Sequence, residues 1–136
     1  MAMNSYYNDT LYPLQNKVLK IIDTLQTPFY LTGGTALSRC YFNHRYSDDL
    51  DFFVNKDPNF IKYSELLISG LVKEFEVETV IKAESYVSLK INKILKIDLV
   101  NDVQFRFGEL KKQEVFSKVD NIENILSNKL SALISR

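Results

Sequence analysis

The sequence predicts an α/β domain in which a mixed, twisted sheet is flanked by helices. Stretches with apolar residues at helical spacing alternate with short runs typical of strands. Three of the predicted strands follow one another without a helix between them, so part of the sheet should be antiparallel. The 136 residues include only four glycines and three prolines, which favours regular structure and a single domain over residues 1–136.

The first half of the chain should contain two helices and two strands. Leu14, Val18 and Ile21 recur at helical spacing after Pro13, a residue suited to a first helical turn, and Pro28 stops this pattern. A short apolar run then leads into two glycines, a second helix and a run rich in aromatic residues. We expect a helix over 13–26, a strand over 29–31, a helix over 35–43 and a strand over 47–55.

The second half should contain two helices and three strands. We expect a helix over 60–75, a strand over 76–82, strands over 86–91 and 94–100, and a helix over 121–136. Asn92-Lys93 can form the tight turn of a hairpin between the third and fourth of these elements. The last helix has an apolar face made of Ile122, Ile125, Leu126, Leu130, Leu133 and Ile134. Because this pattern persists to Ile134, we expect a helical continuation that is missing or supplied by another chain.

Composition excludes several classes of protein. Seventeen basic and seventeen acidic residues cancel, so contact with a nucleic acid or a membrane surface would need a local patch. No run approaches the ~18 apolar residues that span a bilayer, so no membrane partner is expected. The single cysteine, Cys40, excludes an intrachain disulfide and suits a reducing cytoplasm. Together with His44 it also leaves too few soft ligands for a zinc cluster.

Two carboxylates should share one face of the strand over 47–55. Side chains alternate in a strand, so Asp49 and Asp51 point the same way while Leu50 enters the core. Neighbouring carboxylates repel unless a cation lies between them, and Mg²⁺ prefers one or two carboxylates with phosphate oxygens. The simpler interpretation makes Asp49 part of a turn and Asp51 a solubilising charge on an edge strand. A shift of register would place Asp48, rather than Asp49, beside the metal.

A third carboxylate lies in a later strand. Asp98 stands between Ile97 and Leu99, where an acid needs a partner. If this strand lies beside the earlier one, three carboxylates converge and can hold two metal ions, an arrangement used for in-line phosphoryl or nucleotidyl displacement. The alternative is an ion pair with Lys90 or Lys96 across the sheet.

The glycine pair Gly33-Gly34 follows a predicted strand. Glycine lets the backbone turn sharply and approach a ligand closely, and Thr35 then begins a helix whose free N–H groups suit an anion. A triphosphate bound there would place its metal-bound oxygens near the carboxylates. The motif Gly-x-x-x-x-Gly-Lys is absent, which disfavours an ATPase with that loop. By itself, such a glycine pair is more often a plain tight turn.

Four blocks of sequence occur in an order typical of one enzyme family. They are Gly33-Gly34-Thr35-Ala36-Leu37, Arg45-x-Ser47-x-Asp49-Leu50-Asp51-Phe52, Lys96-Ile97-Asp98-Leu99 and Ile125-Leu126-Ser127-Asn128-Lys129-Leu130-x-Ala132. With these blocks the chain resembles the AbiEii-type nucleotidyltransferases, toxins of bacterial abortive-infection and toxin–antitoxin modules within the DNA polymerase β-like superfamily. The resemblance implies a nucleotidyltransferase-like core.

The resemblance also implies a role for each block. The glycine turn and the hydroxyl residue after it would bind the triphosphate, and the acids would coordinate two Mg²⁺ ions. The third acid would also help to activate the incoming hydroxyl. The implied catalytic and metal-binding residues are Asp49, Asp51 and Asp98, and the implied nucleotide-binding residues are Gly33, Gly34, Thr35, Arg45, Ser47 and Lys129. For Arg45, a surface ion pair is the alternative.

The reaction implied by this resemblance is metal-dependent transfer of NMP from an NTP to an acceptor hydroxyl, with release of pyrophosphate. The implied partners are the NTP, an RNA acceptor such as a tRNA 3′ end, and a cognate antitoxin protein. Family members continue into a helical C-terminal half, which we expect to be absent here. One alternative is an inactive remnant that binds nucleotide or a partner protein. A carboxylate-dependent hydrolase, such as a nuclease, ranks below both.

Overall fold

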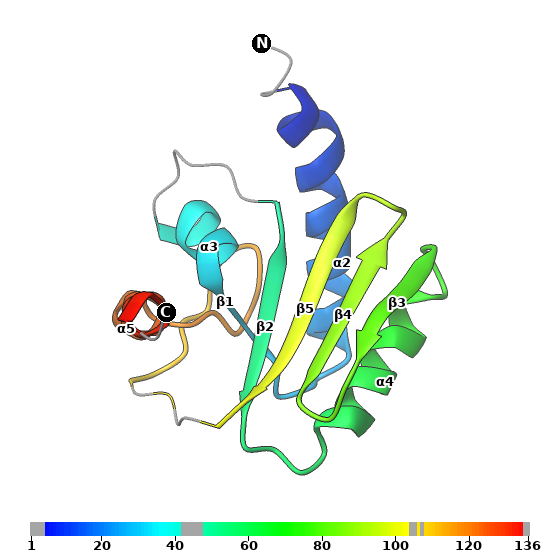
Figure 1. The fold of residues 1–136 in the computed structure, drawn as a ribbon. Helices are drawn as coiled ribbons and strands as arrows, with labels where there is room; N and C mark the ends of the chain where they lie inside the picture. Colours follow the sequence, from blue (N-terminus) through cyan, green and yellow to red (C-terminus); the bar gives the residue numbers. More distant parts are fainter. Residues whose placement is uncertain (1–4, 42–47, 104–105, 107, 135–136) are drawn as a thin grey trace.

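The fold is built on one mixed sheet of five strands (Figure 1). The computed structural model describes residues 5–41, 48–103, 106 and 108–134. The sheet has the strand order β1-β2-β5-β4-β3, in which β2 and β5 are parallel and the other neighbours are antiparallel. The strands are β1 (Tyr30–Thr32), β2 (Leu50–Asn55), β3 (Val77–Lys82), β4 (Tyr86–Ile91) and β5 (Leu95–Asp102). The predicted α/β class and its antiparallel part are confirmed.

The helices are distributed unevenly around this sheet. They are η1 (Tyr7–Leu11), α2 (Tyr12–Thr24), α3 (Gly33–Ala36), η2 (Leu37–Tyr41), α4 (Phe60–Leu71) and α5 (Ile122–Ile134). Figure 1 shows α2 and α4 against one face of the sheet, with α3 and α5 beside its β1 end. Within the described residues, no helix covers the opposite face of β3, β4 and β5. Lys90, Lys96 and Asp98 on that face consequently keep part of their surface exposed, whereas Ser88 is buried.

The hydrophobic core uses one face of the central strands. Leu50 and Phe52 of β2 are fully buried, as are Ile97 and Leu99 of β5. They belong to one apolar cluster with residues of α2 and α4. Burying each such side chain contributes about 1.5–3 kcal/mol, which holds the register of both strands. The alternate residues of β2 and β5 consequently face the other side of the sheet.

The hairpin turn has the conformation that its sequence predicts. Asn92 and Lys93 have positive φ values of 52° and 60°. The N–H of Ile94 donates to the carbonyl oxygen of Ile91 at 2.9 Å. Two consecutive residues with positive φ match the right-handed twist of the flanking antiparallel strands.

Several predicted boundaries differ from the structure; for example, the helix predicted over 60–75 ends at Leu71, and the helix predicted from residue 35 begins at Gly33. The first helix ends at Thr24 rather than residue 26, because Gln26 adopts a positive φ of 54° that a helix does not allow. The strand predicted from residue 47 begins at Leu50, so Asp49 lies just before it. Residues 42–47 are outside the described part of the chain.

The predicted apolar face of α5 is only partly buried. Ile125 is 1% exposed, whereas Leu126, Leu130 and Leu133 are 45%, 59% and 64% exposed. These three leucines of the apolar face are therefore exposed in the described part of the chain, although α5 contacts η2. The side chain of Ile134 lies outside the described residues. No helix in the described ranges combines the length and apolar content needed to cross a bilayer.

Candidate active site

A row of polar residues crosses the sheet on the face opposite the core. Asp51 of β2 is the register partner of Asp98 in the parallel strand β5 and of Thr32 in the antiparallel strand β1. Asp98 is in turn opposite Ser88 of β4. Directly opposed residues in adjacent strands share a face, so the carboxylates of Asp51 and Asp98 lie side by side. The register thus brings two of the three acids considered in the sequence side by side.

The glycine turn lies against this row. Gly33 has a φ of +76°, and a Cβ atom built on it would lie 3.1 Å from Cγ and 3.2 Å from Cβ of Asp51, and closer still to Oδ2. Any side chain at this position would therefore collide with the Asp51 carboxylate. Glycine satisfies both the positive φ and the close approach. The predicted glycine turn and the predicted carboxylates consequently meet at one place.

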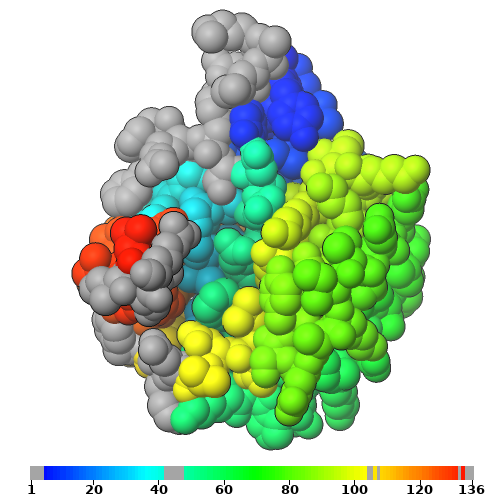
Figure 2. Space-filling view, in the orientation of Figure 1, coloured from blue at the N-terminus to red at the C-terminus, as the bar shows by residue number. Residues whose placement is uncertain are grey.

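A pocket of about 290 Å³ opens at the meeting point. Figure 2 shows the hollow between α5 (red) and β5 (yellow), with β2 at its base. Its lining residues come from four elements and the turn: Thr32, Gly33, Asp51, Phe53, Asp98, Val100, Ile125, Asn128 and Lys129. Lys129 is exposed and places a cation on the α5 wall, opposite the carboxylates of the sheet. Four residues predicted from sequence thus line one cavity.

The electrostatics of the pocket favour a bound cation. Burial raises the pKa of Asp51 to about 6, and repulsion by Asp98 and then Asp49 adds to the effect. The pKa of Asp49 is also raised, first by burial and then by Asp98, while Lys96 opposes the shift. Ionised carboxylates in this cluster destabilise one another, and a divalent ion would relieve that repulsion.

Asp98 is held by three side chains. Its Oδ1 accepts hydrogen bonds from the hydroxyl groups of Tyr86, at 3.0 Å, and Ser88, at 2.9 Å. Its Oδ2 lies 3.5 Å from Nζ of Lys96. The ion pair considered as an alternative is therefore present, but it occupies one oxygen only and leaves Asp98 on the pocket wall. The two hydroxyl partners were missed by the sequence analysis, although both belong to the alternating strand over 86–91.

Asp49 does not complete a three-carboxylate cluster. It precedes β2, and it is not among the residues that line the pocket. Among the described residues, no group of three or more Asp, Glu, His or Cys side chains is arranged to hold a metal ion. The structure therefore brings together Asp51 and Asp98, a pair of carboxylates of the kind that Mg²⁺ takes together with substrate phosphates. This pair fits one Mg²⁺, and the two-metal arrangement stays a prediction.

Comparison with known proteins gives the family. A family described as the nucleotidyl transferase AbiEii toxin of a type IV toxin–antitoxin system matches residues 18–136. The chain belongs to this family. The resemblance inferred from the four sequence blocks is thereby confirmed.

Two solved structures share the fold of this AbiEii-family chain. JHP933 from Helicobacter pylori is 24% identical with a TM-score of 0.58, over 87% of this chain and 55% of that one. A protein of H. pylori described as a candidate nucleotidyltransferase is 24% identical with a TM-score of 0.57, over 85% of this chain and 56% of that one. The chain thus spans little more than half the length of these relatives. No curated protein sequence matches it.

The other nucleotide-binding residues predicted for this AbiEii-family chain have varied positions. Thr35 is fully buried, and its hydroxyl donates to the backbone carbonyl of Asp49, so it links α3 to the start of β2. Gly34 is half-buried in α3, next to Gly33. Arg45 and Ser47 lie outside the described residues. Phosphate binding by these four residues stays a prediction.

A buried carboxylate that the sequence analysis missed positions the α5 wall. Asp120 is fully buried and accepts hydrogen bonds from Thr32 Oγ1 at 3.0 Å, Asn124 Nδ2 at 2.7 Å and Arg106 Nη2 at 2.6 Å. Oδ1 of Asn121 accepts the backbone N–H of Asn124 at 2.7 Å, which caps the first turn of α5. Asp120 therefore ties β1 and Arg106 to the helix that carries Lys129. Asp-Asn directly before an apolar helix was a readable capping signal.

We expect Asp120→Ala to unfold the chain more readily than any surface charge change. Removing the carboxylate leaves the largely buried guanidinium of Arg106 without its ion-pair partner, which costs about 3–5 kcal/mol. Urea denaturation measures this change in the free energy of unfolding. As a control, Glu65→Ala breaks the exposed ion pair with Lys82 and should cost about 0.2–1 kcal/mol. Equal effects of the two substitutions would contradict the role given to Asp120.

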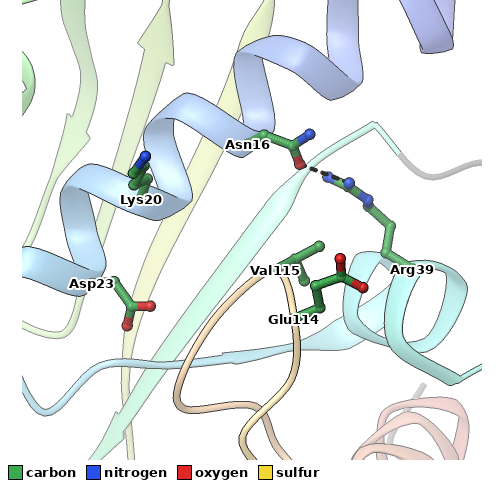
Figure 3. A pocket seen from close by; sticks show the side chains of 6 residues that line it. All are labelled: Asn16, Lys20, Asp23, Arg39, Glu114 and Val115. Carbon is green, nitrogen blue, oxygen red and sulfur yellow. Dashed lines mark hydrogen bonds between the residues drawn. The ribbon is translucent and has the colours of Figure 1, made fainter.

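A larger cavity of about 570 Å³ lies elsewhere, between α2, η2 and the loop at 114–115 (Figure 3). Two of its charged side chains already stabilise the fold through contacts with neighbouring residues. Arg39 donates to Asn16 Oδ1 at 2.7 Å and to Gln15 Oε1 at 3.0 Å, and its guanidinium stacks on the ring of Tyr12. Asp23 on α2 accepts the backbone N–H of Ser117 at 3.1 Å, which secures the loop. Size alone therefore does not make this cavity the catalytic site.

Proposed function

We propose that the chain is a metal-dependent nucleotidyltransferase, which transfers NMP from an NTP to an acceptor hydroxyl and releases pyrophosphate. The observation that carries this proposal is the meeting of Asp51, Asp98 and the side-chain-free backbone of Gly33 at one pocket. Membership of the AbiEii nucleotidyltransferase family supports it. Pairs of carboxylates beside a phosphate-binding turn are suited to displacement at phosphorus.

Each part of the pocket has a task in this reaction. The acceptor oxygen forms a bond to the α-phosphorus, the bond from that phosphorus to the bridging oxygen breaks, and pyrophosphate leaves. Mg²⁺ held by Asp51 and Asp98 would neutralise phosphate charge, and a second ion would also involve Asp49. Gly33 and Gly34 give the triphosphate access to the backbone, and the Lys129 ammonium balances its charge from α5. In this proposal Asp98 would also draw the proton from the acceptor hydroxyl.

The acceptor and the biological setting belong to the same proposal. We take an RNA end, such as the 3′ end of tRNA, as the acceptor, and an antitoxin as the partner that opposes the toxin. The family description, a toxin of a type IV toxin–antitoxin system, supports the antitoxin. A cytoplasmic location stays a prediction from the single cysteine.

A labelling experiment tests the reaction. The protein is incubated with Mg²⁺, total tRNA and each NTP in turn, labelled either on the α- or on the γ-phosphate. Transfer of NMP labels the acceptor only from the α-position, because the γ-phosphate leaves with pyrophosphate. Asp98→Asn should abolish this label, whereas Asp102→Asn, at the far end of the same strand, should keep it. The proposal fails if no acceptor is labelled and calorimetry detects no nucleotide binding.

An inactive nucleotide-binding remnant is the second candidate. The observation that favours it is the lack of a three-carboxylate cluster within the described residues. A thermal-shift titration with Mg²⁺ and NTP, run beside the labelling assay, separates the two. Stabilisation by Mg-NTP without transfer to protein or RNA would support the remnant.

A further inference from the structure

We propose that the two oxygens of Asp98 have different tasks: Oδ1 anchors the side chain to β4, and Oδ2 is the metal-facing oxygen, which Lys96 occupies until a divalent ion displaces it. This inference rests on the proposed function, because it concerns the metal that nucleotidyl transfer needs. It assigns positioning roles to Tyr86, Ser88 and Lys96.

The contacts of Oδ1 show why it serves as the anchor. A carboxylate oxygen has about two lone-pair positions, and the hydroxyls of Tyr86 and Ser88 use both of them. Ser88 is 2% exposed and lies directly opposite Asp98 in the register, so its hydroxyl has little freedom to move away. With Oδ1 saturated in this way, a metal ion at Asp98 would have to use Oδ2.

The contact of Oδ2 is of a different kind. Nζ of Lys96 lies 3.5 Å away, and the lysine side chain is 44% exposed. Because the lysine end of this pair is exposed and its stem is flexible, the contact is weak enough for a divalent ion to compete with it. The Lys96 ammonium therefore pairs with Oδ2 of Asp98 in the absence of a metal ion, and a divalent ion can displace it.

Lys90 offers a matched comparison. It is the register partner of Lys96 on β4, and both lie on the same face of the sheet. The residues differ in that only Lys96 forms an ion pair with Asp98 among the described salt bridges. Removing the positive charge of either lysine should thus have a similar general effect on metal binding. Only Lys96 would compete directly with the metal ion for Oδ2 of Asp98.

Metal binding without nucleotide tests the inference. Mn²⁺ suits the same oxygen ligands as Mg²⁺, and the fraction bound can be measured by electron paramagnetic resonance. We expect Lys96→Met to bind Mn²⁺ about two- to fivefold more tightly than the natural chain, and Lys90→Met to bind it nearly as the natural chain does. Ser88→Ala should weaken Mn²⁺ binding about 10–100-fold, because outer partners orient metal ligands, and Ser88→Thr should restore much of it.

The outcomes separate this inference from the proposed function. If Lys96→Met and Lys90→Met change the affinity equally, the lysine acts through charge alone and displacement is wrong. If Ser88→Ala binds Mn²⁺ as tightly as the natural chain, the anchoring task of Oδ1 is wrong. In both cases nucleotidyl transfer stands. If the natural chain binds no Mn²⁺, with or without NTP, the inference and the metal-dependent reaction fail together.

Discussion

Asp51→Asn is expected to abolish nucleotidyl transfer and, at the same time, to make the protein more stable at neutral pH. Loss of a metal ligand should lower the transfer rate by more than about 100-fold, since removing even outer partners costs about 10–100-fold. The gain in stability follows from the pKa of Asp51, which burial and the neighbouring acids raise to about 6. Asparagine has the same shape and carries no charge to desolvate. Transfer assays and urea denaturation measure the two effects.

The pH dependence of this gain has a definite sign. The folded protein binds the Asp51 proton more tightly than the unfolded chain, whose carboxyl has a pKa near 3.8. Between about pH 4 and pH 6 the folded protein keeps the Asp51 proton, whereas the unfolded chain has released it. The free energy of unfolding therefore falls as the pH rises through this range. Asp51→Asn lacks this dependence. At pH 7 the variant should be more stable by on the order of 1–3 kcal/mol, and near pH 4 the difference should vanish.

A control variant and a metal titration test whether these effects are specific to Asp51. Asp9→Asn changes an exposed carboxylate of η1 and should alter neither transfer nor the pH dependence. Saturating Mg²⁺ should stabilise the natural chain more than Asp51→Asn, because a ligand stabilises only the state that binds it. A variant that is less stable than the natural chain at pH 7 would show that the Asp51 charge is satisfied within the fold.

Gly33→Ala has the second large effect. The residue would keep a φ of +76°, which costs a residue with a Cβ about 1–2 kcal/mol. The new methyl group would also meet the Asp51 carboxylate and push it out of line with Asp98. We expect a loss of about 2–4 kcal/mol in the free energy of unfolding and loss of metal binding in the variant that still folds. Denaturation and Mn²⁺ binding at low temperature measure these changes.

A control variant and a double-mutant cycle separate strain from collision. Gly108→Ala shares the φ of +76° and would place its Cβ 2.6 Å from Nδ2 of Asn121, away from the carboxylates. It should lose stability but retain Mn²⁺ binding. Adding Asp51→Ala removes the carboxylate atoms nearest to the new methyl group and leaves only Cβ, so the two substitutions together should cost about 1 kcal/mol less than their sum. Simple additivity would show that the close approach of Gly33 to Asp51 is unimportant.

Local sequence patterns predicted most of the helices and strands, although not η1. Hydrophobic periodicity of 3.6 or 2 residues reports which side of a helix or strand is buried, and Asn92-Lys93 predicted its turn because Asn tolerates positive φ. The same logic predicted that Asp51 and Asp98 leave the core face of their strands. For α5 the apolar stripe showed which face prefers burial but not whether anything packs against it, and Leu126, Leu130 and Leu133 are exposed.

The pocket depended on contacts between distant segments. The parallel pairing of β2 with β5 sets Asp51 directly against Asp98, and no local signal states which strands are neighbours. β2 begins three residues later than alternation predicted, so Asp49 lies before the strand. The backbone carbonyl of Asp49 accepts a hydrogen bond from the hydroxyl of Thr35. Asp120 could be read as a helix cap, but its bonds to Thr32 and Arg106 join segments 88 and 14 residues apart.

The sequence by itself determined the α/β class, the approximate extent of the helices and strands, the family, and the presence of acids and a glycine turn suited to nucleotide chemistry. These follow from local preferences and short motifs, which depend on neighbours along the chain. Only the tertiary structure decided which acids face one another, that Gly33 is confined by the carboxylate of Asp51, and that Lys96 takes one oxygen of Asp98. Those facts depend on strand order and register, which the packing of the whole core sets.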